Sequence, residues 1–234
     1  MSHETLAKTF DGWAAEGRDG SMEREHGDVV RQVLDRLAIR PGERILDLGC
    51  GNGWATRLLA RAAPGVSAVG IDVSPAMVER AEALHSFTIR ARYEVAPFER
   101  LPLAEASFDR VFSMEALYYA VDLDRALGEA FRVLAPGGSL EVVVDYYEES
   151  AATAQWSCFT GVAMHRLSEA GWRQAFERAG FAGMRLARVV DSRGPGDPAS
   201  FVPSVCYPDW ETRRAVHAAG SLWIHGEKPA RPAG

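Results

Sequence analysis

The segment ILDLGCGNGW, residues 45–54, constrains the fold of this 234-residue chain more than any other stretch. It begins as an apolar run and turns within a few residues into Gly49, Gly51 and Gly53, with Asp47 near the end of the run. Glycine allows a positive φ and a close approach of a ligand to the main chain. The start of a helix offers free N–H groups and a partial positive charge. The segment therefore predicts a buried strand, a ligand-binding turn and a helix.

Strand and helix patterns alternate along the rest of the chain. Apolar and β-branched runs predict strands at residues 43–49, 66–72, 91–97, 108–115, 139–147, 184–190 and 221–227. Apolar residues at helical spacing predict helices at residues 28–39, 54–62, 74–84, 122–134 and 168–179. Asp28, Ser74 and Ser168 stand where N-caps are expected. The alternation predicts an α/β fold with a doubly wound, mostly parallel sheet and helices on both faces.

No linker-like composition divides the chain, so we expect a single domain over residues 1–234. Residues 1–27, 146–167 and 191–219 fit the alternation poorly. In open α/β sheets, ligands bind beyond the carboxyl ends of the strands, and irregular segments on a rigid scaffold often carry function. We therefore predict that residues 1–27 form an N-terminal lid and that residues 146–167 and 191–219 are substrate-side insertions.

Composition excludes several classes of protein. The formal net charge of -6 argues against a general nucleic-acid binder. The three cysteines, Cys50, Cys158 and Cys206, show neither metal-ligand nor disulfide spacing, so we expect no metal site and a reducing cytoplasmic location. No apolar stretch is long enough to span a membrane, and the first residues do not resemble a secretory signal.

Two cofactor classes use a glycine turn of this kind. A dinucleotide prefers G-x-G-x-x-G, and Trp54 stands where the last glycine of that fingerprint belongs. Asp47 suits a cationic group or a hydroxyl better than a pyrophosphate. Asp72 ends the next predicted strand, where an acid can bind both hydroxyls of a ribose. Ribose hydroxyls and a cationic amino-acid end describe S-adenosylmethionine, and a nicotinamide dehydrogenase is the rival interpretation.

Four blocks, ILDLGCGNG, GIDVSP, LPLAEASFDRVFSMEAL and RVLAPGGSLEV, resemble the class I S-adenosylmethionine-dependent methyltransferases in order and spacing. The resemblance covers about residues 29–190. It implies a Rossmann-like, seven-stranded sheet whose last strand, residues 221–227, is antiparallel. It also implies S-adenosylmethionine as the cofactor and S-adenosylhomocysteine as the product.

The resemblance implies roles for individual residues. The methionine end of the cofactor would bind to Asp47, Gly49, Cys50, Gly51, Asn52 and Gly53. Asp72 would bind the ribose. The adenine and ribose would contact Val73, Met77, Pro97, Phe98 and Glu99, with Phe98 packing on the ring. Met114 would face the methionine chain.

The N-terminal segment mixes large apolar and charged side chains. As a lid, it would close the pocket with Trp13 and Met22, meet the cofactor carboxylate with Arg18, and orient the substrate with His26. The alternative is an amphipathic surface helix whose charged face is merely solvated.

Methyl transfer from a sulfonium is a direct displacement, so positioning and desolvation can supply most of the acceleration. An O- or N-acceptor also needs a proton removed in some cases. We predict His165 as the base, with Tyr119 and Tyr146 beside it. The predicted substrate contacts, which would complete an aromatic pocket for a small and even cationic acceptor, are Glu115, Tyr118, Tyr147 and Trp156. Alternatively, these tyrosines pack their loops and His165 is structural.

The segment after the fourth predicted strand, SMEALYY, contains no N-P-P-Y or D-P-P-Y sequence of the kind that marks amino groups in planar bases. With the acidic charge balance, this disfavours a DNA methyltransferase and favours a small-molecule acceptor. The alternatives are a protein or tRNA acceptor, a cofactor-binding protein without catalysis, and a use of S-adenosylmethionine for a reaction other than methylation.

Overall fold

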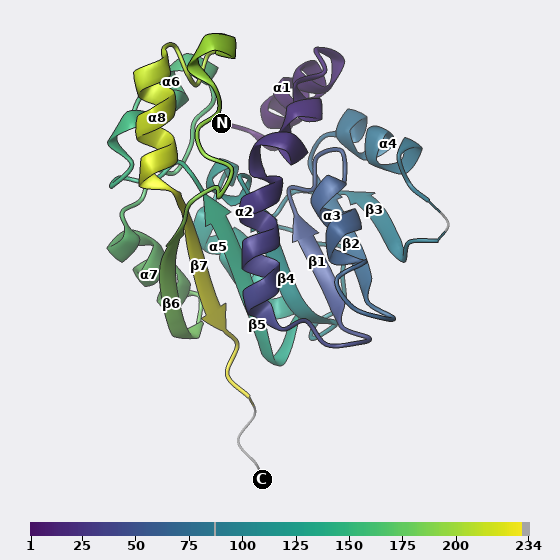
Figure 1. Ribbon diagram of the computed structural model, residues 1–234. Coiled ribbons are helices and arrows are strands. Elements are labelled where there is room, and N and C mark those ends of the chain that lie inside the picture. The colour runs from purple at the N-terminus through teal and green to yellow at the C-terminus, as the bar shows by residue number, and fades with distance from the viewer. Residues whose placement is uncertain (87, 231–234) are drawn as a thin grey trace.

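The computed structural model describes residues 1–86 and 88–230, which fold around one seven-stranded sheet. The strand order is β3-β2-β1-β4-β5-β7-β6 (Figure 1). The strands are β1 (Arg44–Leu48), β2 (Ser67–Asp72), β3 (Ala91–Val95), β4 (Phe108–Met114), β5 (Leu134–Val144), β6 (Ala182–Val189) and β7 (Ser221–Glu227). The first five strands run parallel, and β7 is antiparallel to both β5 and β6. The predicted fold class is confirmed, including the antiparallel last strand.

Helices cover both faces of this sheet. They are α1 (His3–Ala15), α2 (Met22–Leu37), α3 (Trp54–Leu59), α4 (Pro75–Ala83), α5 (Leu123–Val133), α6 (Trp156–Thr160), α7 (Glu169–Arg178) and α8 (Trp210–Ala219). Short 3₁₀ turns lie at Arg18–Ser21, Leu117–Tyr119, Ala151–Thr153 and Pro198–Ser200. None of the helices in the described ranges is long and apolar enough to cross a membrane.

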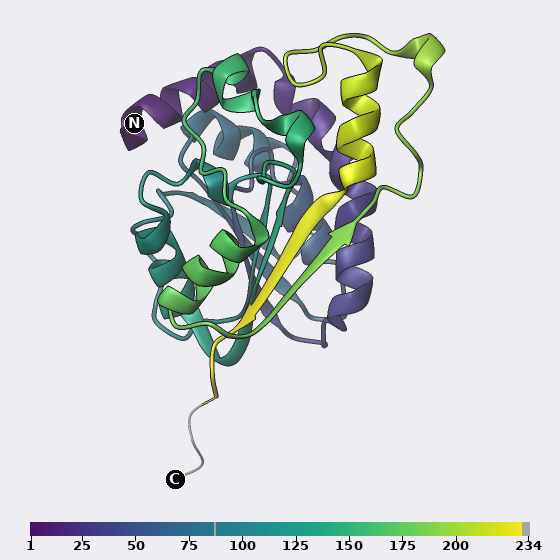
Figure 2. The same ribbon diagram turned by 90° about the vertical axis from the view of Figure 1, so that its left-hand side faces the viewer.

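The two sides of the sheet have separate hydrophobic cores. Side chains of α2 and α3 pack with one face, and those of α5 and α7 pack with the other. Figures 1 and 2 show α1, α6 and α8 gathered at one end of the sheet, beyond the carboxyl ends of the parallel strands. Three segments far apart in the sequence thus meet where an open α/β sheet binds ligands.

Several local signals behave as the sequence predicts. The Ser74 hydroxyl accepts a hydrogen bond from the Met77 amide and caps α4, and the Ser168 hydroxyl caps α7 in the same way. Pro75 occupies the first turn of α4, where its missing N–H costs nothing. Both helices begin at the predicted residues, because an N-cap hydrogen bond involves only residues within three positions of one another.

Several predicted boundaries differ from those in the structure. Helix α2 begins at Met22, so Asp28 lies inside it and is not a cap. The Asp28 carboxylate instead accepts hydrogen bonds from Gln32 and from the backbone and hydroxyl of Ser192. The predicted end of the lid at residue 27 also falls within α2. Strand β5 begins at Leu134, because the chain pairs with β4 at Phe108 before the predicted start at residue 139.

A buried ionic network joins β4, β5 and β7 at the centre of the sheet. Fully buried Glu141 accepts hydrogen bonds from Arg110, Trp223 and His225. Burial alone would lower the pKa of His225, but the hydrogen bond and charge of Glu141, aided by Glu227, raise that pKa above its ordinary value. The Glu141 carboxylate is therefore the acceptor on which the network depends.

We expect Glu141→Gln to lower the free energy of unfolding by about 2–4 kcal/mol, because it leaves buried cations without their partner. Glu227→Gln is the matched control: it also contacts His225 but is half exposed, so its effect should stay below about 1 kcal/mol. Because the pKa of His225 is raised in the folded protein, its contribution to the free energy of unfolding is present at low pH and is lost as the pH rises through that pKa. Denaturant unfolding at pH 6 and pH 9 should therefore show the larger Glu141 effect at pH 6, and equal effects of the two variants would contradict this account.

Candidate functional site

The glycine turn between β1 and α3 has three glycines with different surroundings. Gly49, Gly51 and Gly53 all have positive φ, which glycine adopts without strain. A Cβ on Gly49 would lie 2.1 Å from the Ala116 Cβ, and one on Gly53 would lie 2.6 Å from the Tyr93 ring. A Cβ on Gly51 would meet no protein atom within 4 Å. Two glycines therefore allow packing, whereas the middle one leaves open space above the main chain.

Asp72 connects this turn to the end of β2. Its Oδ2 accepts a hydrogen bond from the Gly51 amide at 2.9 Å, and its Oδ1 accepts one from the Ser74 amide at 2.9 Å. Burial raises the pKa of Asp72 to about 6 although these amides oppose the shift. The carboxylate faces the cavity described below, so a bound hydroxyl can still reach it.

Asp47 lies behind the turn. Its Oδ2 accepts a hydrogen bond from the Thr56 hydroxyl at 2.6 Å, and burial raises its pKa to about 7. Among the predicted cofactor residues, only Asp47 and Gly53 do not line the cavity. Asp47 is thus positioned to brace α3 against β1, and the structure does not bring it to the predicted methionine end.

A cavity of about 1010 Å³ opens beyond the carboxyl ends of β1, β2 and β4. This volume lies at the upper end of the range for pockets that bury drug-sized ligands, which is ~300–1,000 Å³. Its floor contains Gly51, Asp72 and Met114, and its side wall contains Phe98. It therefore has room for a nucleoside-sized cofactor together with a second small molecule.

The N-terminal segment packs onto this floor. The Asp11 carboxylate accepts hydrogen bonds from the Ser74 hydroxyl at 2.5 Å and the Ala76 amide at 3.1 Å, so α1 caps α4. The Asn52 side chain donates to the backbone carbonyl and the carboxylate of Asp19. Each contact joins the segment before α2 to a loop that carries a predicted cofactor residue. The N-terminal segment is therefore packed against the floor of the cavity, and its role as a lid stays a prediction.

Aromatic rings from the lid and from the turn after β4 form one wall. Phe10 lies 5.0 Å from Trp13 and 5.1 Å from Tyr119 between ring centroids, and the Arg18 guanidinium lies 4.2 Å from the Trp13 centroid. Tyr118 is in ring contact with Tyr119. Two residues of this wall, Tyr118 and Tyr119, also belong to the aromatic pocket that the sequence predicts.

Glu99 lines the cavity but serves mainly to hold its rim together. One carboxylate oxygen accepts a hydrogen bond from His3 at 2.7 Å. The other accepts bonds from the backbone amides of Val121 and Asp122. Its oxygens thus already have protein donors, and it links α1 to the start of α5.

Three residues predicted for the acceptor side do not line the cavity. The His165 ring forms a hydrogen bond with the Ala120 carbonyl at 2.9 Å, so it fixes the turn after β4, which argues against a role as base. Tyr146 is buried behind the wall, stacked on Trp156 at 6.4 Å. Tyr147 points away, and its hydroxyl donates to the Ala219 and Gly220 carbonyls. Of the remaining predicted acceptor residues, His26, Glu115, Tyr118, Tyr119 and Trp156 do line the cavity.

Sequence reasoning did not name the individual residues that the C-terminal third contributes to the wall. Within the segment 191–219, which the sequence predicts as a substrate-side insertion, the residues that line the cavity include Asp191, Phe201, Tyr207, Trp210 and Arg213. The Trp156 indole donates to the Cys206 carbonyl at 3.0 Å, which ties this segment to α6. No periodic pattern marks these residues, and only the concentration of aromatic residues between 201 and 210 could have drawn attention to them.

Comparison with known proteins agrees with this geometry. Residues 46–142 match a family described as a methyltransferase domain. The whole chain is 30% identical over 245 residues to a malonyl-[acyl-carrier protein] O-methyltransferase from Halorhodospira halophila and covers 76% of it. It is 35% identical over 133 residues to O-methyltransferase resE from Aspergillus sclerotiorum, a match to 56% of this chain that spans 50% of that relative's length.

A solved structure is also similar over nearly its full length. It is a chain of the complex between the Haloferax volcanii Trm112 methyltransferase activator and a methyltransferase, with a TM-score of 0.84 and 36% identity. The match covers 94% of this chain and 97% of that one. The similarity therefore extends beyond the glycine turn to most of the chain.

We expect Asp72→Ala to weaken S-adenosylhomocysteine binding by about 10- to 100-fold, because charged hydrogen bonds worth about 1.5–3 kcal/mol are lost. Calorimetric titration measures this change. Asp109→Ala is the control, since its carboxylate binds the Arg44 amide at the opposite end of the strands. Equal affinity of Asp72→Ala and wild type would rule out the ribose assignment.

Gly51→Ala and Gly49→Ala should have different effects: the first on the affinity for S-adenosylhomocysteine, and the second on the stability of the fold. The Gly51 variant carries only the cost of a left-handed alanine, about 1–2 kcal/mol, but its methyl group would enter the open space in which we predict the cofactor to bind, so its affinity for S-adenosylhomocysteine should fall. The Gly49 variant forces a clash with Ala116 and should unfold or lose several kcal/mol. Thermal melts with and without S-adenosylhomocysteine test this, and a Gly51 variant that keeps wild-type affinity would refute the assigned path.

Proposed function

The chain belongs to the S-adenosylmethionine-dependent methyltransferases, and on that premise we propose that it methylates a small-molecule acceptor held in the cavity beyond β1, β2 and β4. The observation that carries this proposal is the extent of the cavity, about 1010 Å³, under a cover of lid and C-terminal residues. A cover of this kind suits a small molecule better than a folded protein or a tRNA.

The residues present fit the cofactor. Gly51 offers open main chain, Asp72 offers carboxylate oxygens, and Phe98 with Met77 offers apolar surface for a base. We assign Asp72 to the ribose hydroxyls and the turn at residues 49–53 to the methionine end. Arg18, at the cavity rim, is the candidate partner for the cofactor carboxylate. When bound, S-adenosylmethionine supplies an electrophilic methyl group, which passes to an acceptor lone pair as the sulfonium becomes a neutral thioether.

The acceptor would lie against the aromatic wall. Tyr118, Tyr119 and Trp156 exclude water there and fix the acceptor's direction of approach, which is where most of the acceleration in such a displacement can arise. We further propose that residues 1–27 act as a lid, with residues 146–167 and 191–219 as substrate-side insertions of a single domain. A cytoplasmic location is likewise a proposal, supported by the free thiols of Cys50, Cys158 and Cys206.

Relatives support an oxygen acceptor. The Halorhodospira and Aspergillus relatives are both named O-methyltransferases. The first of them acts on a malonyl group attached to a carrier protein, so an acyl group delivered by a carrier is one form that the acceptor could take.

A second candidate concerns a protein partner. The similar Haloferax chain comes from a complex with the Trm112 methyltransferase activator. We propose that this chain also binds a Trm112-like activator, as an addition to methyl transfer and not as a substitute for it. Co-purification with a tagged Trm112 homologue tests this idea, and separate elution at micromolar concentrations would exclude it.

Radiolabelled methyl transfer tests the acceptor class. Wild-type protein incubated with methyl-labelled S-adenosylmethionine and a metabolite extract should move label into solvent-extractable small molecules. Asp72→Ala serves as the control and should transfer at least tenfold less at limiting cofactor. Label that appears only in RNA, or that stays in precipitated protein after carrier thioesters are cleaved with hydroxylamine, would overturn the proposal, as would cofactor consumption without S-adenosylhomocysteine.

A further inference from the structure

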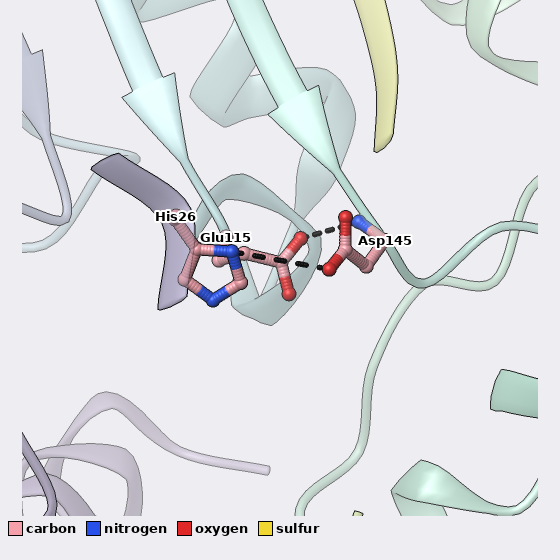
Figure 3. Close-up of side chains that lie close together, drawn as sticks. All are labelled: His26, Glu115 and Asp145. Atoms are coloured by element: carbon pink, nitrogen blue, oxygen red, sulfur yellow. Dashed lines mark hydrogen bonds and ion pairs between the residues drawn. The ribbon is translucent and has the colours of Figure 1, made fainter. Parts of the chain in front are cut away.

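Three buried side chains from three different elements converge at the edge of the cavity. His26 comes from α2, Glu115 directly follows β4, and Asp145 directly follows β5. One potential metal-ligand atom from each residue lies within 4.8 Å of the others. Figure 3 shows the imidazole and the two carboxylates directed toward one another.

Glu115 is held firmly in this arrangement. One of its carboxylate oxygens accepts a hydrogen bond from the Asp145 amide, and the other accepts one from the Tyr118 hydroxyl at 2.8 Å. Its φ of 49° is left-handed, a conformation that costs a residue with a side chain about 1 kcal/mol or more. Strain of this kind is retained mainly at functional sites.

Asp145 has an unused oxygen. Its Oδ2 lies 3.9 Å from His26 Nδ1, but its Oδ1 is buried and has no hydrogen-bond partner among the described residues. Asp145 is 7% exposed, so bulk water satisfies this oxygen poorly. Buried acceptors are normally paired, and an unpaired one in a native fold calls for a missing ion or water.

The local charge is also unbalanced. Within residues 1–86 and 88–230, no lysine or arginine forms an ion pair with Glu115 or Asp145, and His26 is the single cationic candidate. Two carboxyl groups that are both ionised out of water cost several kcal/mol each unless a positive charge compensates them, and a group that is neutral instead holds a proton that a bound cation would displace. One divalent cation would balance both and would use the free Oδ1.

We propose that His26, Glu115 and Asp145 bind one divalent transition-metal cation of the Mn²⁺ type at the inner edge of the cavity. An imidazole nitrogen combined with carboxylate oxygens is a ligand set that suits Mn²⁺, Fe²⁺ or Zn²⁺. Three protein ligands leave coordination positions open. His26 and Glu115 both line the cavity, so these positions face it.

The cation deepens the proposed function, on which this step rests, by selecting the class of acceptor. A metal with open positions binds an oxygen of the acceptor, lowers the pKa of its O–H group and orients its lone pair. The acceptor is then an alcohol, phenol or enol with an oxygen free to coordinate. The rival is a metal-free site in which Asp145 orients His26 as a base.

Titration with Mn²⁺ tests the site without cofactor or acceptor. Protein treated with EDTA and then dialysed is titrated while electron paramagnetic resonance measures free Mn²⁺. One equivalent should bind, and Glu115→Gln and Asp145→Asn should each weaken binding at least tenfold. Glu25→Gln is the matched control, because it removes a carboxylate from the cavity wall on α2, the helix that carries His26. The affinity of this variant for Mn²⁺ should stay within twofold of the wild-type value.

Electron spin-echo modulation gives a second readout on the wild-type protein. Bound Mn²⁺ should show coupling to a histidine nitrogen that disappears in His26→Ala and persists in His165→Ala. Absence of stoichiometric binding, or binding that ignores Glu115→Gln and Asp145→Asn, overturns the metal site and leaves the His26–Asp145 base. Binding of S-adenosylhomocysteine is measured separately, so the failure of one site is distinguishable from the failure of the other.

Discussion

Asp72 holds together the parts from which the cofactor site is built. Its two oxygens accept amide hydrogen bonds from Gly51 in the first turn and from Ser74 at the start of α4. The same carboxylate faces the cavity. Burial raises the pKa of Asp72 and these amide donors oppose that shift, so hydroxyl groups of a ligand that donate to the same carboxylate would also favour its ionised form. The carboxylate that fixes the shape of the turn is therefore also the one that we propose for binding the ribose.

The site divides into a regular floor and an irregular roof. The floor comes from strand ends and helix starts, whose positions follow from the sheet. The roof comes from α1, α6 and the segment leading to α8, which meet beyond the sheet in both views of the fold (Figures 1 and 2). The Asp11 contacts with α4 and the Asn52 contact with Asp19 join the two. In the function that we propose, the floor binds the cofactor and the roof selects the acceptor.

The sequence predicts the floor well because its signals are local. Glycine spacing, the acid at the end of β2 and the Ser74 cap each involve residues a few positions apart. Prediction fails where contacts join distant segments. His165 is bound to the Ala120 carbonyl, Tyr147 faces the Ala219 carbonyl, and residues 191–213 complete the wall, and no spacing rule connects these pairs. The convergence of His26 with Glu115 and Asp145 is invisible for the same reason.

The most direct test of the account is a crystal structure of the protein with S-adenosylhomocysteine. The account predicts both ribose hydroxyls within about 2.6–3.0 Å of the Asp72 carboxylate, the usual range for such bonds, and the ligand's methionine end over Gly51. A ligand whose ribose lies away from Asp72, or a cavity that stays empty at saturating ligand, would contradict the central claim.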